Sequence, residues 1–386
     1  MTTCFLAGLS CAGLYLALML VKAWRSWRYA ISHPEMDQLD AAVTVLQPIL
    51  GGDPTLGESL RKNLQSASAK TKFLWLIDED DSAGRTVAEP LALAEPHHIC
   101  ILICPPCPAG INPKLFKLQQ AIPLVTTEFV AVLDDDTTLS TGHLQQAMAA
   151  LSDCDLYTGL PHYSTGQNVW SSLVAHFVNN NSILTYLPLL TWTGPLTING
   201  MFYVLRTEYL RSLGGFESIL GQLCDDYSFA RLVLQHHGRL KQGITSQRLQ
   251  TSISGPGHYA RQMHRWFLFA NLLVLDQPLA IQLMLVILLG LPPLLLWGSL
   301  LSLSGGWIGG VVLVMLAVVR HVVLRTLHRK LFHEPPTFSP ALSLIAELLQ
   351  PLHLAHASLT RVIVWRSRRI RVGRRGTFTF LPDSSP

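Results

Sequence analysis

The feature that most limits what this chain can fold into is an uncharged apolar stretch near its N-terminus. The stretch Cys4–Val21 contains no charged residue and is nearly as long as the roughly 20 residues that an α-helix needs to span a bilayer. No positive charge precedes it, as it would in a signal peptide, whereas Lys22, Arg25 and Arg28 follow it. Because basic residues are enriched at the cytoplasmic ends of membrane helices, we predict an N-terminal transmembrane helix within residues 1–28, followed by cytoplasmic chain.

The composition agrees with a chain that lies partly in lipid. Hydrophobic residues make up 49% and charged residues 14% of the sequence, whereas about 25% of residues are charged in a typical soluble domain. Mean hydropathy is +0.31. Two further apolar stretches run over Pro278–Trp297 and Leu300–Val319, and Gly305 and Gly306 offer a place to turn the chain. We therefore predict transmembrane helices within residues 276–330 that return the chain to the cytoplasm, since basic residues follow them.

The region 331–386 is less apolar and ends in a cluster of arginines. Its segment Pro340–Trp365 contains Glu347 and Pro351, which favours re-entrant or interfacial helices over a membrane span. The arginines that follow form a basic tail, which at a membrane surface contacts anionic headgroups or phosphates. Nucleic acid is the other common partner of such a segment, and we expect no nucleic acid here because the chain is tethered to a membrane.

Three of the seven cysteines, Cys100, Cys104 and Cys107, lie close together in the sequence. A structural zinc site needs four ligands in paired short spacings, and the sequence offers no second pair. Cys100 and Cys104 fall in an apolar run, so we expect both to be buried, reduced strand residues.

Residues 40–275 alternate between short apolar runs typical of strands and longer segments typical of helices. This alternation indicates βαβ units and a mostly parallel, Rossmann-like α/β sheet, although no G-x-G-x-x-G dinucleotide fingerprint follows the first strand. We predict a capping box of Thr55 and Glu58, a helix cap at Thr141, and Pro113 in the first turn of its helix. The predicted strands are Val43–Ile49, Phe73–Ile77, Ile99–Ile103 and Phe129–Leu133, and the predicted helices are Thr55–Ala69, Thr86–Glu95, Asn112–Ile122, Thr141–Leu151 and Tyr227–His237.

Acidic residues lie where three of these elements end or begin. The segment Asp78–Asp81 follows the second strand, Asp134–Asp136 follows the fourth, and Asp225 and Asp226 precede the last helix. Ligands of open α/β sheets bind at the carboxyl ends of the strands. Helix capping and dipole complementarity would account for one such pair, but three acidic clusters in one domain favour a functional site.

The strand Phe129–Leu133 leads directly into Asp134, Asp135 and Asp136. In extended backbone, Asp134 and Asp136 point to the same side and Asp135 points away, so we predict that Asp135 is the replaceable member. Two convergent carboxylates repel each other, and a divalent cation that bridges to phosphate oxygens would relieve the repulsion. An acidic turn without a metal is the alternative interpretation.

Gln262, Arg265 and Trp266 fall on one face of a predicted helix, at positions i, i+3 and i+4. A guanidinium suits bidentate contact with phosphate, and an indole suits stacking or a lipid interface. The alternative is an interfacial Arg–Trp pair, since the apolar stretch Phe267–Leu275 follows. The apolar segment Trp170–Leu190 is either a lipid-facing flap or core packing, because periodicity alone does not separate the two.

In order and spacing, Asp80, the pair Asp134 and Asp136, Asp226 and the segment Gln262–Trp266 resemble the motifs of membrane-bound inverting glycosyltransferases with the GT-A fold. The resemblance is closest to the ceramide glucosyltransferase family, including its hopanoid-type bacterial relatives. It implies an α/β, GT-A (Rossmann-like) glycosyltransferase domain with N-terminal and C-terminal transmembrane helices. The other similar stretches are Ile111–Lys114, Gly159–Pro161, Asn199–Met201, Gly214–Phe216 and Trp365–Arg371.

The resemblance also implies how the donor would be bound. Asp80 would contact the nucleotide, and Lys114 would lie near its base or phosphates. Asp134 and Asp136 would hold a divalent metal, Mg²⁺ or Mn²⁺, against the diphosphate.

The remaining matched residues would serve the transfer itself. Arg265, with Gln262, would stabilise the leaving UDP, Trp266 would line the acceptor site, and Asp226 would be the catalytic general base. The ceramide enzymes carry a histidine in the stretch that corresponds to Val178–Ser182, which has none here. This departure leaves open which lipid is the acceptor.

The resemblance thus implies an enzyme of glycolipid, sphingolipid-like metabolism, with a cytoplasmic catalytic domain over residues 40–275. It would move a hexose from a UDP-sugar to a lipid hydroxyl with inversion. A processive polysaccharide synthase shares Q-x-x-R-W but needs more membrane helices for a channel. The chain could also be a non-catalytic nucleotide-sugar-binding membrane protein or a carboxylate-rich metal hydrolase. The sugar, the metal and the oligomeric state stay open.

Overall fold

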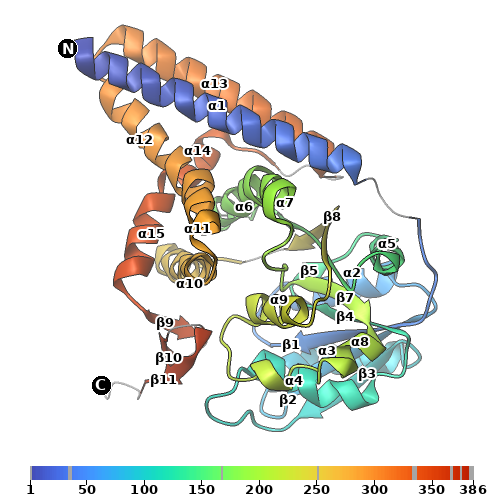
Figure 1. Cartoon of the computed structure of the whole chain (residues 1–386). Helices are drawn as coiled ribbons and strands as arrows, with labels where there is room; N and C mark the ends of the chain where they lie inside the picture. Colours follow the sequence, from blue (N-terminus) through green and yellow to red (C-terminus); the bar gives the residue numbers. More distant parts are fainter. Residues whose placement is uncertain are drawn as a thin grey trace. The chain divides into compact units, whose positions relative to one another are not determined.

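A computed structural model of the chain describes residues 2–33, 37–166, 168–249, 252–332, 337–365, 368–373 and 376–381 (Figure 1). The chain forms two compact units that each combine distant parts of the sequence. The helical unit consists of Met1–His33, His162–Gly194 and Ile253–Ile363. The sheet unit consists of Pro34–Pro161, Pro195–Ser252 and Val364–Pro386.

An eight-stranded sheet forms the centre of the sheet unit, in the order β3-β2-β1-β4-β7-β6-β8-β5. The strands β3, β2, β1 and β4 run parallel, whereas β7 is antiparallel to both β4 and β6, and β5 is antiparallel to β8. The predicted mostly parallel sheet is therefore correct for the first half of the domain only. The strands are β1 (Val43–Ile49), β2 (Thr71–Asp78), β3 (Ile99–Cys104), β4 (Phe129–Leu133), β5 (Thr137–Thr138), β6 (Leu156–Tyr163), β7 (Phe202–Arg206) and β8 (Leu240–Leu249).

Helices cover both faces of this sheet, so its central strands are buried on both sides and read as continuous apolar runs. On one face Val45, Trp75 and Ala131 pack with apolar residues of α2, α3 and α5. On the other face Leu76 and Val132 pack with residues of α4, α8 and α9. The α-helices of this unit are α2 (Leu56–Ser66), α3 (Ser82–Ala94), α4 (Pro113–Ala121), α5 (His143–Ala149), α8 (Thr207–Ser212) and α9 (Asp225–Gln235).

Thr55 is the N-cap residue of α2 as predicted, but the predicted capping box does not form, and the predicted cap of α5 at Thr141 is wrong. Thr55 precedes α2 without a side-chain cap, and its hydroxyl donates to Asp53 Oδ1 instead. Glu58 pairs with Lys62, one turn along the helix, at 2.6 Å. The residue before α5 is Gly142, with φ of 81°, a left-handed conformation that glycine adopts without strain. Pro113 does begin α4 as predicted.

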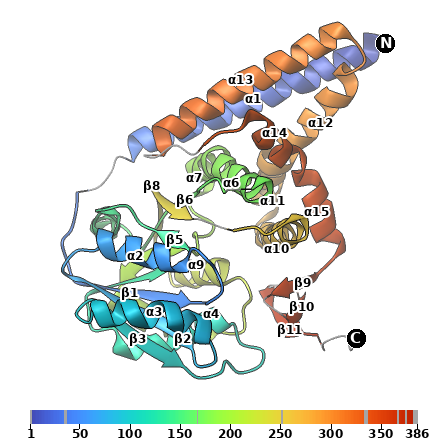
Figure 2. The same ribbon diagram turned by 180° about the vertical axis from the view of Figure 1, so that it is seen from behind.

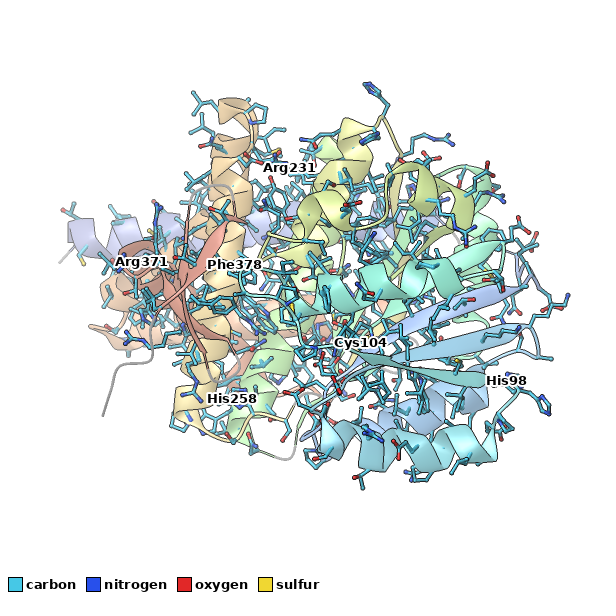
Figure 3. All side chains as sticks on the ribbon, turned by 90° about the horizontal axis from the view of Figure 1, so that it is seen from below. His98, Cys104, Arg231, His258, Arg371 and Phe378 are labelled. Atoms are coloured by element: carbon cyan, nitrogen blue, oxygen red, sulfur yellow. The ribbon has the colours of Figure 1, made fainter. Side chains whose placement is uncertain are left out.

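The cysteine prediction is correct for Cys104, which is buried, and wrong for Cys100, which is exposed. Cys100 lies on β3, the edge strand of the sheet, which is less buried than the central strands. Figure 3 shows His98 and Cys104 at opposite ends of this strand, with Cys104 at the carboxyl end. All seven cysteines are free thiols.

The helical unit contains three helical stretches that are long and apolar enough to cross a membrane, among the residues that the structure describes. These are Thr3–Ser32, Leu279–Leu303 and Trp307–Leu331. The chain turns between the last two at Gly305 and Gly306. Figures 1 and 2 show α1 and α13 side by side. The helices are α1 (Thr2–Ser32), α6 (Val169–Asn181), the π-helix Ser182–Tyr186, α7 (Leu187–Thr193), α10 (Pro256–Leu275), α11 (Leu279–Leu285), the π-helix Val286–Gly290, α12 (Leu291–Leu303), α13 (Trp307–Leu331), α14 (Pro340–Leu348) and α15 (Gln350–Leu359).

A buried polar network joins four of these helices. The Arg320 guanidinium, on α13, donates to the Tyr15 hydroxyl at 3.0 Å, to Glu347 Oε2 at 2.8 Å and to the Ser343 hydroxyl at 3.0 Å. Asn180 of α6 donates to the same Ser343 hydroxyl at 2.8 Å. Charged side chains in membrane bundles are paired in this way because an unpaired charge in lipid is costly.

The C-terminal segment forms a small sheet of β9 (Val362–Trp365), β10 (Arg368–Val372) and β11 (Phe378–Phe380), in the order β11-β10-β9. Figure 3 shows Arg371 and Phe378 on neighbouring strands. Within the sheet unit, Leu223 donates its N–H to the Gly376 carbonyl at 3.1 Å. Part of the predicted basic tail is thus ordered against the segment before α9, while Arg366, Arg374 and Arg375 lie outside the described residues.

Candidate active site

The three aspartates after β4 lie in a tight turn rather than in extended backbone. The Thr137 N–H donates to the Asp134 carbonyl at 3.2 Å, which closes the turn. Asp135 Oδ2 accepts the Leu50 N–H from the loop after β1 at 2.7 Å. The extended geometry on which the prediction for Asp135 rested is therefore wrong, because the chain turns and Asp135 contacts a neighbouring loop. That Asp135 is the replaceable member stays a prediction.

Burial dominates the electrostatics of this turn, and crowding of the carboxylates adds to it. Burial raises the pKa of Asp135 to about 7, and the charge of Asp134 adds to the effect. Burial also raises the pKa of Asp136 well above its usual value, and both neighbouring aspartates reinforce the shift. The turn thus holds more negative charge than its surroundings easily accommodate.

Lys114 brings a positive charge into direct contact with this cluster. Asn112 caps α4 by accepting the backbone N–H groups of Lys114 and Leu115, which fixes Lys114 in the first turn. Its ammonium forms ion pairs with Asp134 at 2.7 Å and with Asp225 at 2.9 Å. It also donates to the Gly200 carbonyl at 3.0 Å.

The ammonium of Lys114 stays charged in this position. Burial by itself lowers the pKa of Lys114, but the charges of Asp134 and Asp225 outweigh it and hold that pKa well above its usual value. Lys114 therefore joins the turn after β4 to the start of α9 through a lasting positive charge.

Asp226 lies in the first turn of α9 and is partly buried. Its Oδ1 accepts the Tyr227 N–H at 2.7 Å and the Cys224 thiol at 2.9 Å. Burial raises the pKa of Asp226 to about 6, and the charge of Asp225 adds to the shift. A carboxylate of this kind is ionised at neutral pH and still basic enough to accept a proton.

Glycine is required at position 200 by close packing against this aspartate. A Cβ on Gly200 would lie 2.9 Å from the Asp226 Cβ, closer than such atoms approach in proteins. Gly200 belongs to the stretch Asn199–Met201 that carried part of the family resemblance. Tyr203, on β7, is buried behind the cluster, and burial raises its pKa well above the usual value. The sequence reasoning assigned no role to Cys224, Gly200 or Tyr203.

The acidic segment after β2 divides into three separate tasks. Asp78 pairs with the buried Lys117 at 3.1 Å. Asp81 caps α3 by accepting the Gly84 N–H, and it also accepts the Gly51 N–H at 2.7 Å. The predicted donor ligand Asp80 is exposed at the same carboxyl edge of the sheet. Capping and pairing thus explain Asp78 and Asp81 and leave Glu79 and Asp80 as the exposed acids.

The three predicted residues of α10 belong to the helical unit. Arg265 Nη2 donates to Gln262 Oε1 at 3.0 Å, as expected for neighbours on one helix face. The Trp266 ring is partly exposed, stacks on Phe177 of α6 with centroids 6.2 Å apart, and meets Tyr163 edge-on at 6.0 Å. Trp266 is therefore fixed by two aromatic neighbours.

The segment Trp170–Leu190 was predicted to be either a lipid-facing flap or core packing, and different parts of it agree with each interpretation. Val178 and Ile183 are buried, and Asn179 exchanges two hydrogen bonds with the Tyr163 backbone. These residues are core packing. Tyr186, at the start of α7, is 38% exposed, so apolar surface is presented only towards the end of the segment.

The donor set of the aspartate turn fits a divalent cation completed by substrate. Over the described ranges, no three His, Cys, Asp or Glu side chains form an arrangement that could hold a metal ion by themselves. Mg²⁺ is usually bound through one or two carboxylates together with substrate phosphates, rather than in an all-protein cage. Burial, and then repulsion from Asp134 and Asp135, raises the pKa of Asp136, and a bound cation would offset that repulsion. Carboxylate oxygens, such as those of Asp134 and Asp136, are the ligands that Mg²⁺ and Mn²⁺ prefer.

Comparison with known proteins places this geometry in context. The chain is 23% identical over 207 residues to ceramide glucosyltransferase 1 of Caenorhabditis elegans, covering 53% of this chain and 44% of that protein. The chain thus spans less than half the length of that curated relative.

A solved structure shares the fold. The mannosyltransferase PcManGT from Pyrobaculum calidifontis, in complex with GDP-Man and Mn²⁺, superposes with a TM-score of 0.54 at 15% identity, over 92% of this chain and 98% of that chain. This likeness confirms the predicted α/β fold of GT-A type, and the chain's own span-length helices agree with the predicted apolar helices. The family model for glycosyl transferase family 21 matches residues 6–378. The chain therefore belongs to glycosyl transferase family 21.

Proposed function

We propose that this glycosyltransferase moves a hexose from a UDP-sugar to the hydroxyl of a membrane lipid, with inversion, in the cytoplasmic leaflet. The observation that carries the proposal is the state of Asp226. Its Oδ1 is held by two donors, and its pKa of about 6 suits a general base. The ceramide glucosyltransferase relative supports a lipid acceptor, and the mannosyltransferase complex supports a nucleotide-sugar donor and a divalent cation.

The transfer is a single displacement. The acceptor oxygen forms a bond to the anomeric carbon of the sugar, the bond from that carbon to the diphosphate oxygen breaks, and its electron pair leaves with UDP. The acceptor proton passes to Asp226. A base on the face opposite the leaving group inverts the configuration, and positioned general-base help is worth about 10²–10⁴-fold in rate.

Two kinds of residue would bind the donor: those that help to neutralise the charge of the diphosphate and those that contact the nucleotide. Asp134 and Asp136 would hold the divalent metal, which when bound neutralises negative charge on the diphosphate. Asp80 would contact the nucleotide. Lys114 keeps Asp134 in place through its ion pair, and it would add positive charge near the phosphates.

The α10 residues are assigned to the leaving group and the acceptor. The pairing of Arg265 with Gln262 pre-organises the guanidinium, which would then stabilise the charge that builds on UDP. Trp266, held by Phe177 and Tyr163, would line the acceptor site.

A lipid acceptor agrees with the three span-length helices of the chain. The Arg25 guanidinium lies 4.9 Å from the Trp192 ring, which agrees with a membrane interface at this end of α1. The basic residues at this end favour the cytoplasmic side. Lys22 supports this orientation less than its sequence position implied, because its ammonium is buried and donates to the Leu288 carbonyl at 2.8 Å.

Transfer by the purified full chain tests the proposal. The protein is incubated with Mg²⁺ or Mn²⁺, a panel of UDP-sugars and a lipid extract of its host, and products are analysed by mass. We expect one hexose per lipid. A ladder of products would indicate a processive synthase, and absence of UDP release would indicate a non-catalytic binding protein. Release of phosphate or cleavage of an ester without sugar transfer would indicate a hydrolase.

The variant Asp226→Asn tests the base. We expect transfer to fall by at least about 10²-fold while UDP binding is retained, since the amide keeps the volume of the side chain and loses its basicity. The matched control is Asp153→Asn, which changes an exposed acid paired with Lys241 and should leave transfer unchanged. Full activity of the Asp226 variant would remove the base assignment.

A further inference from the structure

The carboxylate of Asp226 is bonded unevenly at its two oxygens. Oδ1 accepts both the Tyr227 N–H at 2.7 Å and the Cys224 thiol at 2.9 Å. No hydrogen bond to Oδ2 occurs among the described residues. A carboxylate with one oxygen doubly bonded cannot rotate freely, so the direction of its other oxygen is fixed.

Gly200 leaves room for this orientation from the other side. A Cβ at Gly200 would lie 3.4 Å from Asp226 Oδ2 and 2.9 Å from Asp226 Cβ. The glycine backbone therefore packs along the side of Asp226 that bears Oδ2. The orientation is set by the thiol and an N–H on one oxygen and by close backbone packing beside the other.

Cys224 is suited to remain a donor at every working pH. It occupies the position before the first residue of α9, with φ of −93° and ψ of 89°, and it is buried. Burial raises the pKa of the Cys224 thiol well above its usual value, and the charge of Asp226 adds to the shift. The sulfur thus keeps its proton and donates it to Asp226 Oδ1 in a hydrogen bond.

We propose that Cys224 is a positioning residue for the reaction: its thiol fixes the Asp226 carboxylate through Oδ1, so that Oδ2 is the atom that receives the acceptor proton. This inference rests on the proposed function, because it assumes that Asp226 is the base. Cys224 does not itself touch a substrate in this scheme. It acts by holding the carboxylate in one rotamer and by stabilising its ionised form.

Besides the thiol, three other polar groups face Asp226, and the pKa of Asp226 has to be considered together with them. Asp225, on the same helix, raises the pKa of Asp226, and Lys114 of α4 lowers it. Tyr203 of β7 lies within electrostatic range and is un-ionised at working pH. The Cys224 hydrogen bond lowers the pKa of Asp226. Its loss must therefore move that pKa upwards, in the direction opposite to the loss of Asp225.

The test compares Cys224→Ala with Cys224→Ser in the full-length protein. Loss of one weak hydrogen bond to an ionised carboxylate should move the acidic limb of kcat/KM upwards by about 0.5–1 pH unit in the alanine variant. It should also lower kcat by about tenfold with the donor KM unchanged. The serine hydroxyl keeps a donor. The acidic limb of the kcat/KM profile of Cys224→Ser should therefore lie at no higher pH than that of the unmodified protein.

Cys154→Ala is the matched control, because Cys154 is also a buried thiol and donates to the Ala150 carbonyl rather than to a carboxylate. It should leave the acidic limb in place, which separates the hydrogen bond from the general effect of deleting a buried sulfur. An unshifted limb in Cys224→Ala would overturn the inference. If the alanine variant does not fold, an upward shift in Cys224→Ser would overturn it instead.

A second readout does not depend on catalysis. The carboxylic-acid C=O band of Asp226, assigned as the band missing in Asp226→Asn, is followed by infrared spectroscopy during a pH titration. It should appear at higher pH in Cys224→Ala than in the unmodified protein. If no sugar is transferred by any preparation, the proposed function fails while the band still tests the hydrogen bond. If transfer occurs and neither limb nor band moves, only the role of Cys224 fails.

Discussion

A single ammonium group ties together the acidic residues of the candidate site. Lys114 contacts Asp134 after β4, Asp225 at the start of α9 and the carbonyl of Gly200 before β7. The three segments are distant in sequence, and the ammonium connects two carboxylates and one carbonyl among them. Lys114 is thus a structural cation of the site as well as a candidate donor ligand.

Replacement of Lys114 by methionine keeps the side-chain length and removes the charge. Because the lysine and its partners are 20–29% exposed, we expect a loss of about 1–3 kcal/mol in unfolding free energy, less than for a fully buried pair. Donor affinity should fall as well, because Asp134 loses its anchor. The control is Lys62→Met, which breaks the exposed pair with Glu58 and should cost about 0.5 kcal/mol or less. Equal stability losses in the two variants would contradict a special role for Lys114.

The pH dependence of activity should report Asp226. A general base must be unprotonated, and the pKa of Asp226 is raised to about 6, so kcat/KM should be constant above about pH 7 and fall about tenfold per unit below pH 6. The measurement uses saturating divalent metal, so that Asp134 and Asp136 do not titrate. A limb near pH 4, the ordinary range of an aspartate, would mean that burial of Asp226 is relieved in the working enzyme.

At the scale of single residues, candidate acidic residues were easier to find in the sequence than the contacts that they make. Asp134 follows a strand and Asp226 lies in the first turn of a helix. Their order along the chain matches that of the family's motifs, which is why the sequence points to them. The extended-backbone argument for Asp135 failed because the chain turns at once after β4, and a turn is set by contacts such as that with Leu50. The Cys224 thiol and Gly200 act through tertiary neighbours, which sequence spacing does not contain.

Among the elements, α4 is the one whose placement matters most for the site. Asn112 caps it with its side-chain oxygen, and the amide nitrogen donates to the carbonyls of Gln222 and Leu223 at 3.0 and 3.1 Å. One buried side chain therefore connects the start of α4, which carries Lys114, to the segment that leads into α9.

Asn112→Ala should lower the unfolding free energy by about 2–4 kcal/mol, the sum of a lost cap and of two buried carbonyls left unpaired. It should also weaken donor binding, because Lys114 loses its fixed helix start. Asn168→Ala is the matched control, since Asn168 caps α6 and donates to the Ile253 carbonyl. That variant should lose stability and retain donor affinity. Unaltered donor affinity in the Asn112 variant would show that the start of α4 does not contribute to donor binding.

The elements predicted most accurately are those buried on both faces. The bounds of β1 and β4 agree with the prediction to the residue, because continuous apolar runs between turn residues leave little choice. The antiparallel strands β6 to β8 were not predicted, since β8, Leu240–Leu249, carries polar residues along much of its length. The capping box at Thr55 does not form because Asp53 competes for the Thr55 hydroxyl, and the cap at Thr141 was wrong because Gly142 takes the N-cap position in a left-handed conformation.

For the molecule as a whole, the arrangement of the helical unit depends on a charged group buried between apolar helices. Arg320 is 3% exposed, and its partner Glu347 comes from α14, which is too short to span a membrane. The pair therefore fastens a short helix to the span-length helices α1 and α13, with Tyr15 and Ser343 completing the hydrogen bonds. Such a connection is specific to one packing of the bundle, because apolar contacts alone allow helices to slide.

Breaking this pair should destabilise the helical unit, and removing it entirely should not. Arg320→Met leaves the Glu347 carboxylate buried without its partner, and Glu347→Gln leaves the guanidinium charge uncompensated, so each should cost about 3–5 kcal/mol. The double variant Arg320→Met with Glu347→Met should recover most of that loss, because neither charge remains buried. The measurement is the unfolding free energy in detergent or nanodiscs, analysed as a double-mutant cycle. The exposed pair Arg85–Glu89 is the control. Its coupling energy should be about 0.5 kcal/mol or less. If the losses of the single variants simply add in the double variant, the two charges do not act as a pair, and the position of α14 must depend on its apolar packing alone.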